Sequence, residues 1–186
     1  MAYLYVITSY LLGTVLTAAL VARLKGVDLQ NENSGNLGAR NAGRTLGKSA
    51  FVIVAISDGL KGLLVVFIGR MLEFPELAIA LAVIAVILGH LYPFWNKGKG
   101  GKGVATIIGA MVIFSPVHAV VFIIGFLITL LFTKSATLSM VSGFVIYGVF
   151  ILSQFEAGWV MSLALLLVIW KQRKNILERV KPDVLE

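Results

Sequence analysis

Residues 26–48 form a polar stretch whose residue types suit the binding of an anion. Its small and amide residues include Asn33, Ser34, Gly35, Asn36, Gly38, Asn41 and Gly43. Glycines permit a close approach of the backbone, so successive N–H groups can point at one anion. Arg40 and Arg44 add guanidinium groups suited to phosphate, and residues four apart share a face if the stretch is helical. The stretch predicts a phosphate site or, alternatively, a polar turn whose arginines only set membrane topology.

Residues 96–103 form a second stretch of this kind, rich in glycine and lysine. It includes Lys99, Gly100, Gly101, Lys102 and Gly103 and directly precedes an apolar segment. Backbone N–H groups at the start of a helix attract anions. A Walker A motif requires Ser or Thr after its lysine, whereas Gly103 follows Lys102. The stretch therefore predicts a second anion site or, alternatively, another basic loop beside a membrane.

Three of the titratable residues inside apolar segments are candidates for a functional role. Asp58 and Lys61 are three apart and would share one face of a helix. A charge at the membrane centre costs about 2.5–3.5 kcal/mol on insertion scales, which makes both residues candidates for function. They either neutralise each other or contact a substrate. His90 is either a base or phosphate ligand, or a residue that only forms a hydrogen bond at the membrane interface.

The segments that carry these residues are strongly apolar. The 186 residues are 59% hydrophobic and only 13% charged, with a mean hydropathy of +0.95, whereas soluble domains carry about 25% charged residues. The chain has no cysteine, which excludes a disulfide-stapled secreted scaffold. The composition predicts an all-α integral membrane protein, with residues 1–186 as one polytopic membrane domain.

Seven apolar segments are candidates for membrane spans. A helix needs about 20 apolar residues to cross about 30 Å of hydrocarbon. The predicted spans are 1–22, 49–69, 77–95, 103–115, 117–132, 137–154 and 158–170. The uncharged run 103–132 is divided at Ser115 and Pro116, because proline inside a helix removes a backbone hydrogen bond. The first span is predicted to be a membrane helix rather than a cleavable signal, since no basic region precedes it.

The basic residues predict the side of the membrane on which each loop lies. With seven spans, all of the 16 basic residues except Lys61 and Arg70 lie on one side. The positive-inside rule then places the N-terminus outside, and loops 26–48 and 96–103 and the tail 171–186 in the cytoplasm. The net charge of +7 is thus a topology signal, and no motif indicates a nucleic-acid partner.

These stretches resemble the PlsY family, the bacterial acyl-phosphate:glycerol-3-phosphate acyltransferases. Two long family patterns and a short one occur in order. The first pattern is G-S-G-N-[IL]-G-A-T-N-x-x-R-x-x-G, the short one is D-x-x-K-G, and the second pattern is G-H-x-x-P followed by K-G-G-K-[GA]-V-A-T. The matching residues are Ser34, Gly35, Asn36, Gly38, Asn41, Arg44, Gly47, Asp58, Lys61, Gly62, Gly89, His90, Pro93 and 99–106. The resemblance extends over nearly the whole chain, and two long motifs at the expected spacing make it specific.

The chain also departs from the family at defined positions. Asn33 and Arg40 replace a Gly and a Thr of the first pattern. Met140 replaces the second Ser of a family-like S-L-x-S. In a third pattern, R-H-x-x-N-I followed by G-x-E, Asn175 is retained, but Gln172, Pro182 and Val184 stand in place of His, Gly and Glu. Glutamine cannot titrate, so two alternatives stay open: a modified enzyme or a divergent paralogue without activity.

The resemblance implies an enzyme that moves a fatty acyl group from acyl phosphate to glycerol 3-phosphate, giving lysophosphatidic acid for phospholipid biosynthesis. It further implies a bacterial plasma membrane protein whose site faces the cytoplasm. The catalytic residues would be Ser34, Arg44, His90 and Asn175. The substrate- or phosphate-binding residues would be Gly35, Asn36, Gly38, Asn41, Lys61, Lys99, Gly100, Gly101, Lys102 and Gly103. The sequence contains no metal-ligand cluster and no Ser-His-Asp spacing, so no metal, cofactor or covalent serine intermediate is expected.

Two other functions compete with this interpretation. A non-catalytic paralogue that binds glycerol phosphate or phospholipid and regulates a membrane partner would explain two intact loops beside an altered third pattern. A small transporter would need a polar path across the membrane, and Asp58 with Lys61 is the only intramembrane charged pair, so this function ranks last. The sequence does not indicate an oligomeric state.

Overall fold

The computed structural model describes residues 1–180, and within that range every regular element is a helix. The helices are α1 (Ala2–Thr14), α2 (Thr17–Leu24), η1 (Leu29–Asn31), α3 (Ala39–Leu46), α4 (Lys48–Met71), α5 (Glu76–Leu91), η2 (Phe94–Asn96), α6 (Val104–Phe114), α7 (Pro116–Thr133), α8 (Ala136–Gln154), α9 (Gly158–Lys171) and α10 (Arg173–Val180), where η marks a 3-10 helix. The all-α prediction is confirmed for the described residues.

Five segments of the described chain are long and apolar enough to cross a membrane: Ala2–Leu24, Lys48–Met71, Glu76–Asn96, Pro116–Thr133 and Ala136–Gln154. The predicted spans 103–115 and 158–170 correspond to shorter apolar helices, α6 with 11 residues and α9 with 14. At 1.5 Å per residue these two helices are about 16 and 21 Å long, less than the ~30 Å of a hydrocarbon core. Length and composition thus support five of the seven predicted spans, and the other two remain a prediction.

The first predicted span is interrupted at a point that the sequence does not indicate. α1 ends at Thr14, and the next two residues, Val15 and Leu16, adopt extended backbone angles before α2 begins. Side chains from elsewhere bind the carbonyl groups that this break exposes. Trp95 Nε1 donates to the Thr14 oxygen at 2.9 Å, and Lys61 Nζ donates to the Val15 oxygen. These bonds satisfy polar groups that would be costly to leave unpaired in apolar surroundings.

The predicted division of the run 103–132 is confirmed. α6 ends at Phe114, and Pro116 is the first residue of α7. Proline is tolerated at this position because the first N–H groups of a helix have no partner within the helix. The Phe114 carbonyl accepts a 2.7 Å hydrogen bond from the Arg70 guanidinium. Arg70, which the charge pattern places away from the other basic residues, therefore closes the exposed end of α6.

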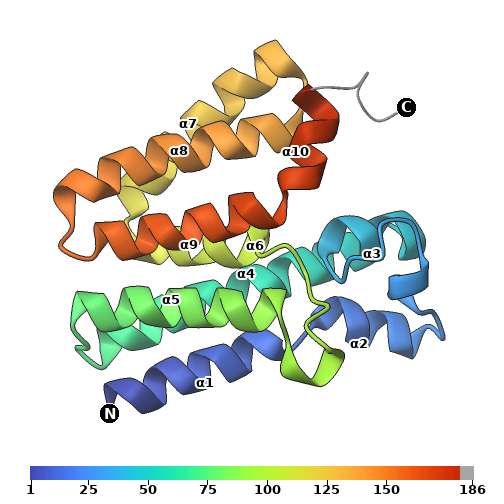
Figure 1. Cartoon of the computed structure of the whole chain (residues 1–186), viewed down its shortest axis with the longest axis horizontal. Coiled ribbons are helices and arrows are strands. Elements are labelled where there is room, and N and C mark those ends of the chain that lie inside the picture. Colours follow the sequence, from blue (N-terminus) through green and yellow to red (C-terminus); the bar gives the residue numbers. More distant parts are fainter. Residues whose placement is uncertain (181–186) are drawn as a thin grey trace.

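Tight helix pairs bring the two polar stretches together. α1 packs on α5, α4 on α6 and α7 on α8. The α4–α6 contact requires Gly62, because a Cβ there would overlap the carbonyl oxygen of Thr106. In Figure 1, α2, α3, α10 and the loop before α6 lie at one end of the long helices, and the N-terminus lies at the other. Both predicted anion-binding stretches and the start of α10 therefore share one end of the molecule.

Candidate functional site

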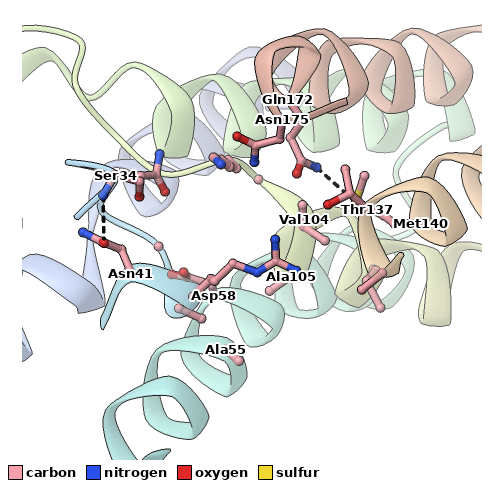
Figure 2. A pocket seen from close by; sticks show the side chains of 18 of the residues that line it. Ser34, Asn41, Ala55, Asp58, Val104, Ala105, Thr137, Met140, Gln172 and Asn175 are labelled. Carbon is pink, nitrogen blue, oxygen red and sulfur yellow. Dashed lines mark hydrogen bonds between the residues drawn. The ribbon is translucent and has the colours of Figure 1, made fainter. Parts of the chain in front are cut away.

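A cavity of about 480 Å³ lies at this end of the molecule. Nine residues that the sequence predicted for the site line it: Ser34, Asn36, Gly38, Asn41, Arg44, His90, Lys102, Gly103 and Asn175. Figure 2 shows side chains of the first stretch on one side of the cavity, with α8 and the start of α10 on the other. The fold thus joins three parts of the sequence that lie far apart along the chain.

Five predicted site residues do not line the cavity: Gly35, Lys61, Lys99, Gly100 and Gly101. The N–H groups of the last two glycines donate to the carbonyls of Leu91 and His90, at 3.2 and 2.9 Å. The Gly100 carbonyl in turn accepts a 3.2 Å hydrogen bond from Asn36, which links the two stretches. These backbone groups hold the loop in place, and the N–H groups at the start of α6, after Gly103, are the ones left without helical partners.

Asn41 holds the first stretch in shape. This buried side chain donates to the carbonyls of Leu29 and Glu32, at 3.0 and 3.2 Å. Its oxygen accepts a 3.4 Å hydrogen bond from the N–H of Ser34, as Figure 2 shows. The amide of Asn41 therefore uses both of its polar atoms within the protein, and it fixes Ser34 at the cavity wall.

Of the four basic residues that line the cavity, Arg40, Arg44 and Lys102 lie close enough for their charges to interact. The two arginines lie one turn apart on α3, as their spacing predicted. Burial lowers the pKa of Lys102 below that of an ordinary lysine, and the charge of Arg40 lowers it further, with Glu178 opposing the shift. Because neighbouring cations disfavour one another's charge, the binding of a dianion would stabilise all three. The cavity is thus suited to a phosphate group.

Asp58 and His90 line the cavity, and Asp58 forms a buried ion pair with Lys61. Lys61 Nζ donates to Asp58 Oδ1 at 2.7 Å, and His90 Nδ1 lies 3.8 Å from the same oxygen. All three side chains are buried. Within the described residues, His90 Nδ1 has no hydrogen-bond partner. The geometry favours neutralisation of Asp58 by Lys61 over direct contact of Lys61 with a substrate.

Two of the departures from the family pattern contact each other. Gln172 is buried at the end of α9, and its Nε2 donates to Met140 Sδ on α8 at 3.0 Å (Figure 2). Both residues line the cavity, as does the retained Asn175. Gln172 and Met140, which replace a family-like His and Ser, therefore lie together in the same wall of the cavity. The other two departures of the third pattern, Pro182 and Val184, lie outside the described residues.

Other lining residues were not assigned to the site from sequence. They include Phe51, Phe122, Phe126, Thr137, Met140, Gln172, Glu178 and Arg179, whereas the sequence had already indicated Arg40 and Asp58. On α10, Asn175, Glu178 and Arg179 have the spacing i, i+3, i+4, which places them on one helix face and could have indicated two of them. The phenylalanines carry no such signal, because any lipid-facing helix contains similar residues. They give the cavity apolar lining in addition to its basic residues.

Comparison with known proteins agrees with these observations. Residues 3–181 match the family model described as glycerol-3-phosphate acyltransferase. Glycerol-3-phosphate acyltransferase 1 of Bacillus cereus is 44% identical over 145 residues, which cover 75% of this chain and 80% of that protein. The glycerol-3-phosphate acyltransferase of Geotalea daltonii is 35% identical over 174 residues, which cover 92% and 90% of the two chains.

Solved structures show the same fold. The glycerol 3-phosphate form of PlsY, an integral membrane glycerol 3-phosphate acyltransferase, matches with a TM-score of 0.87 and 32% identity, over 97% of this chain and 92% of that one. The lysophosphatidic acid form of PlsY matches with a TM-score of 0.85 and 30% identity over the same shares. The prediction of a helical integral membrane protein is confirmed. So is the family resemblance of the motifs: this chain belongs to the glycerol-3-phosphate acyltransferase family.

Proposed function

We propose that this protein transfers a fatty acyl group from acyl phosphate to the 1-hydroxyl of glycerol 3-phosphate, at the cytoplasmic face of the bacterial plasma membrane. Family membership makes the chain a glycerol-3-phosphate acyltransferase of phospholipid synthesis; the acyl phosphate donor and the sidedness are the proposed parts. The observation that carries the proposal is a single cavity lined both by basic residues, Arg40, Arg44, Lys102 and Arg179, and by phenylalanines of α4 and α7. A phosphate headgroup and an acyl chain would each meet matching chemistry there.

In this reaction the 1-hydroxyl oxygen attacks the carbonyl carbon of acyl phosphate. The new ester bond forms as the bond between that carbon and the phosphate oxygen breaks, and inorganic phosphate leaves with the electron pair. The hydroxyl proton goes to the departing phosphate or to His90, which are the two candidate bases. Because acyl phosphate is already activated, the protein chiefly positions two substrates and stabilises developing negative charge.

Several of the lining residues have a part in that task. Arg44 and Lys102 bind phosphate oxygens, with the N–H groups at the start of α6 as further donors. Ser34, held by Asn41, donates to a phosphate or to the carbonyl oxygen. Asn175, on the opposite wall, orients a substrate oxygen. These roles require only hydrogen bonds and charge, so the reaction needs no covalent enzyme intermediate.

The remaining predicted residues act by shaping the site. Asn36 ties the two stretches together, and the glycines at 35, 38, 100, 101 and 103 let the backbone turn and pack closely. Lys61 acts through Asp58, to which it is bonded. Lys99 adds positive charge to the loop beside the cavity.

The proposed topology has seven spans, an external N-terminus and a cytoplasmic site. Two observations support it. The loops with most of the basic residues lie at the same end of the helices (Figure 1), as the positive-inside rule requires. The break between α6 and α7 supplies the additional turn that keeps both the second stretch and α10 at that end.

The decisive experiment is turnover by purified protein in phosphatidylcholine bilayers. With palmitoyl phosphate and glycerol 3-phosphate we expect lysophosphatidic acid and inorganic phosphate in equal amounts. Palmitoyl-CoA should not replace palmitoyl phosphate, because its bulky carrier would have to share a 480 Å³ cavity with the acceptor. Equal rates with palmitoyl-CoA would refute the donor assignment.

Two variants show whether this turnover uses the cavity. Arg44→Ala removes a charge-assisted bond to phosphate, so kcat/KM for glycerol 3-phosphate should fall about ten- to a hundredfold. Arg23→Ala, at an exposed arginine outside the cavity, is the matched control and should leave kcat/KM unchanged. Binding of glycerol 3-phosphate without turnover in the native chain would favour the non-catalytic paralogue.

A further inference from the structure

A second hollow lies on the outer surface of α3 and the first turns of α4. It is an open groove of about 400 Å³, lined by Arg40, Gly43, Arg44, Lys48, Phe51 and Val52. Arg40, Arg44 and Phe51 also line the cavity described above. The groove and the cavity therefore share a wall, while Lys48 and Val52 belong to the groove alone.

Three of the residues that line this groove are basic. Arg40 and Arg44 are one turn apart on α3, and Lys48 begins α4. Within residues 1–180, none of the three has a carboxylate oxygen within 4.0 Å. The first turn of α4 also contains no acidic residue, although the N-terminal end of a helix is its positive end. A dianion in the groove would complement charges that no described carboxylate neutralises.

The other side of the groove is apolar and continues down the membrane-facing surface of α4. Residues four apart share a helix face, and here that row consists of Lys48, Val52, Ile56 and Leu60. The last three are 49%, 57% and 46% exposed, as expected of side chains that contact lipid. A ligand with its phosphate at Lys48 could thus lay one acyl chain along this row.

Gly43 makes the groove possible. A Cβ at this position would lie 2.8 Å from the Phe51 Cβ, so α3 lies close to α4 only because residue 43 has no side chain. The wall between groove and cavity consists of Phe51 and the side chains of Arg40 and Arg44. Because an arginine side chain is long and flexible, each guanidinium can contact a phosphate on either side of this wall.

We propose that the groove is a docking site for the acyl phosphate donor, which reaches it from the membrane and then passes over Arg40 and Arg44 into the cavity. This inference rests on the proposed function, since it concerns the substrate of that same site. Three basic residues and one apolar row line the groove, and they match a molecule with a terminal phosphate and a single chain. Ordinary phospholipids carry two chains and a singly charged phosphodiester, and glycerol 3-phosphate is water-soluble and needs no route through the membrane.

Kinetics in phosphatidylcholine bilayers test the proposal through Lys48, which lines the groove alone. Lys48→Gln should raise the KM for palmitoyl phosphate about tenfold, the loss of one charge-assisted bond, with kcat and the KM for glycerol 3-phosphate unchanged. Lys48→Arg should restore the native KM. Lys25→Gln, at an exposed lysine outside the groove, is the matched control. An unchanged KM for palmitoyl phosphate, or an equal rise in both KM values, would overturn the proposal.

A second measurement needs no turnover. Hexadecyl phosphate with a photoreactive group in its chain cannot transfer an acyl group, and it should cross-link to Val52 and Ile56 in the native protein. Lys48→Gln should reduce this cross-linking several-fold, and excess phosphatidylglycerol should not compete. Equal cross-linking of both proteins, or full competition by phosphatidylglycerol, would show an ordinary lipid contact and refute the docking site. Absence of turnover beside intact cross-linking would instead contradict the proposed function.

Discussion

At the scale of single residues, Lys102 should control how substrate binding depends on pH. Burial and the charge of Arg40 lower its pKa below that of an ordinary lysine. A lysine with a lowered pKa is charged below that value and loses its charge as the pH rises through it, earlier than a free lysine would. An arginine at the same position would stay charged, because the guanidinium pKa exceeds about 12.

We therefore expect the KM for glycerol 3-phosphate to rise with increasing alkaline pH before an ordinary lysine would lose its charge, in a range where the substrate phosphate is already fully ionised. Lys102→Arg should keep this KM nearly constant over the same range. Initial rates at saturating palmitoyl phosphate measure the effect. If the native protein and Lys102→Arg show the same pH profile, the charge of Lys102 does not bind the acceptor.

At the scale of helices, the contact between Gln172 and Met140 joins the end of α9 to α8 beside the cavity. In the family pattern these two positions carry His and Ser. Changing only one of the two residues to its family counterpart would therefore leave that residue beside a partner that the family does not have there. The two substitutions should be energetically coupled, because residues in direct contact share their interaction energy.

The prediction is that Gln172→His combined with Met140→Ser raises kcat by more than the product of the two single effects. The expected coupling is about 0.5–3 kcal/mol, the range found for contacting residues. A double-mutant cycle of kcat values with palmitoyl phosphate measures it. Asn175→Ala should abolish activity in all four proteins, and strictly multiplicative single effects would show that the contact has no catalytic role.

The sequence predicted those features of the helices and the site that depend on residues close together in the chain. Uncharged runs indicated the helices, Ser115 and Pro116 indicated the break after α6, and the spacing of Arg40 and Arg44 placed both on one helix face. The break after α1 was not predictable, because it depends on Lys61 and Trp95, which are distant in the sequence.

The same distinction explains where the site differs from the sequence-based prediction. The amides of Gly100 and Gly101 were expected to face an anion, yet they bond to the end of α5. The partner of Gln172 could not be known either, because Met140 lies 32 positions away on another helix. A residue type shows what a side chain can bind, whereas the tertiary fold determines what it does bind.

At the scale of the whole molecule, the topology can be tested because the chain has no cysteine of its own. Single cysteines at Lys97 and Lys174 should react with an impermeant thiol reagent only from the cytoplasmic side. A cysteine at Glu73, in the turn between α4 and α5, should react only from outside. Labelling of the residue-174 cysteine from outside would contradict the seven-span arrangement.

The shortness of α6 has a consequence for the surrounding lipid. In the proposed arrangement α6 runs from the cavity, at Gly103, to the outer surface, at Phe114, which is about 16 Å of a hydrocarbon layer of about 30 Å. The part of the cavity at Gly103 then lies roughly in the middle of the bilayer, and water must reach it from the cytoplasm. Membranes respond to such a mismatch by thinning next to the short helix, at a modest cost per ångström. Bilayer thickness thereby becomes a variable that helps set how deep the carbonyl of the donor lies relative to the phosphates of both substrates.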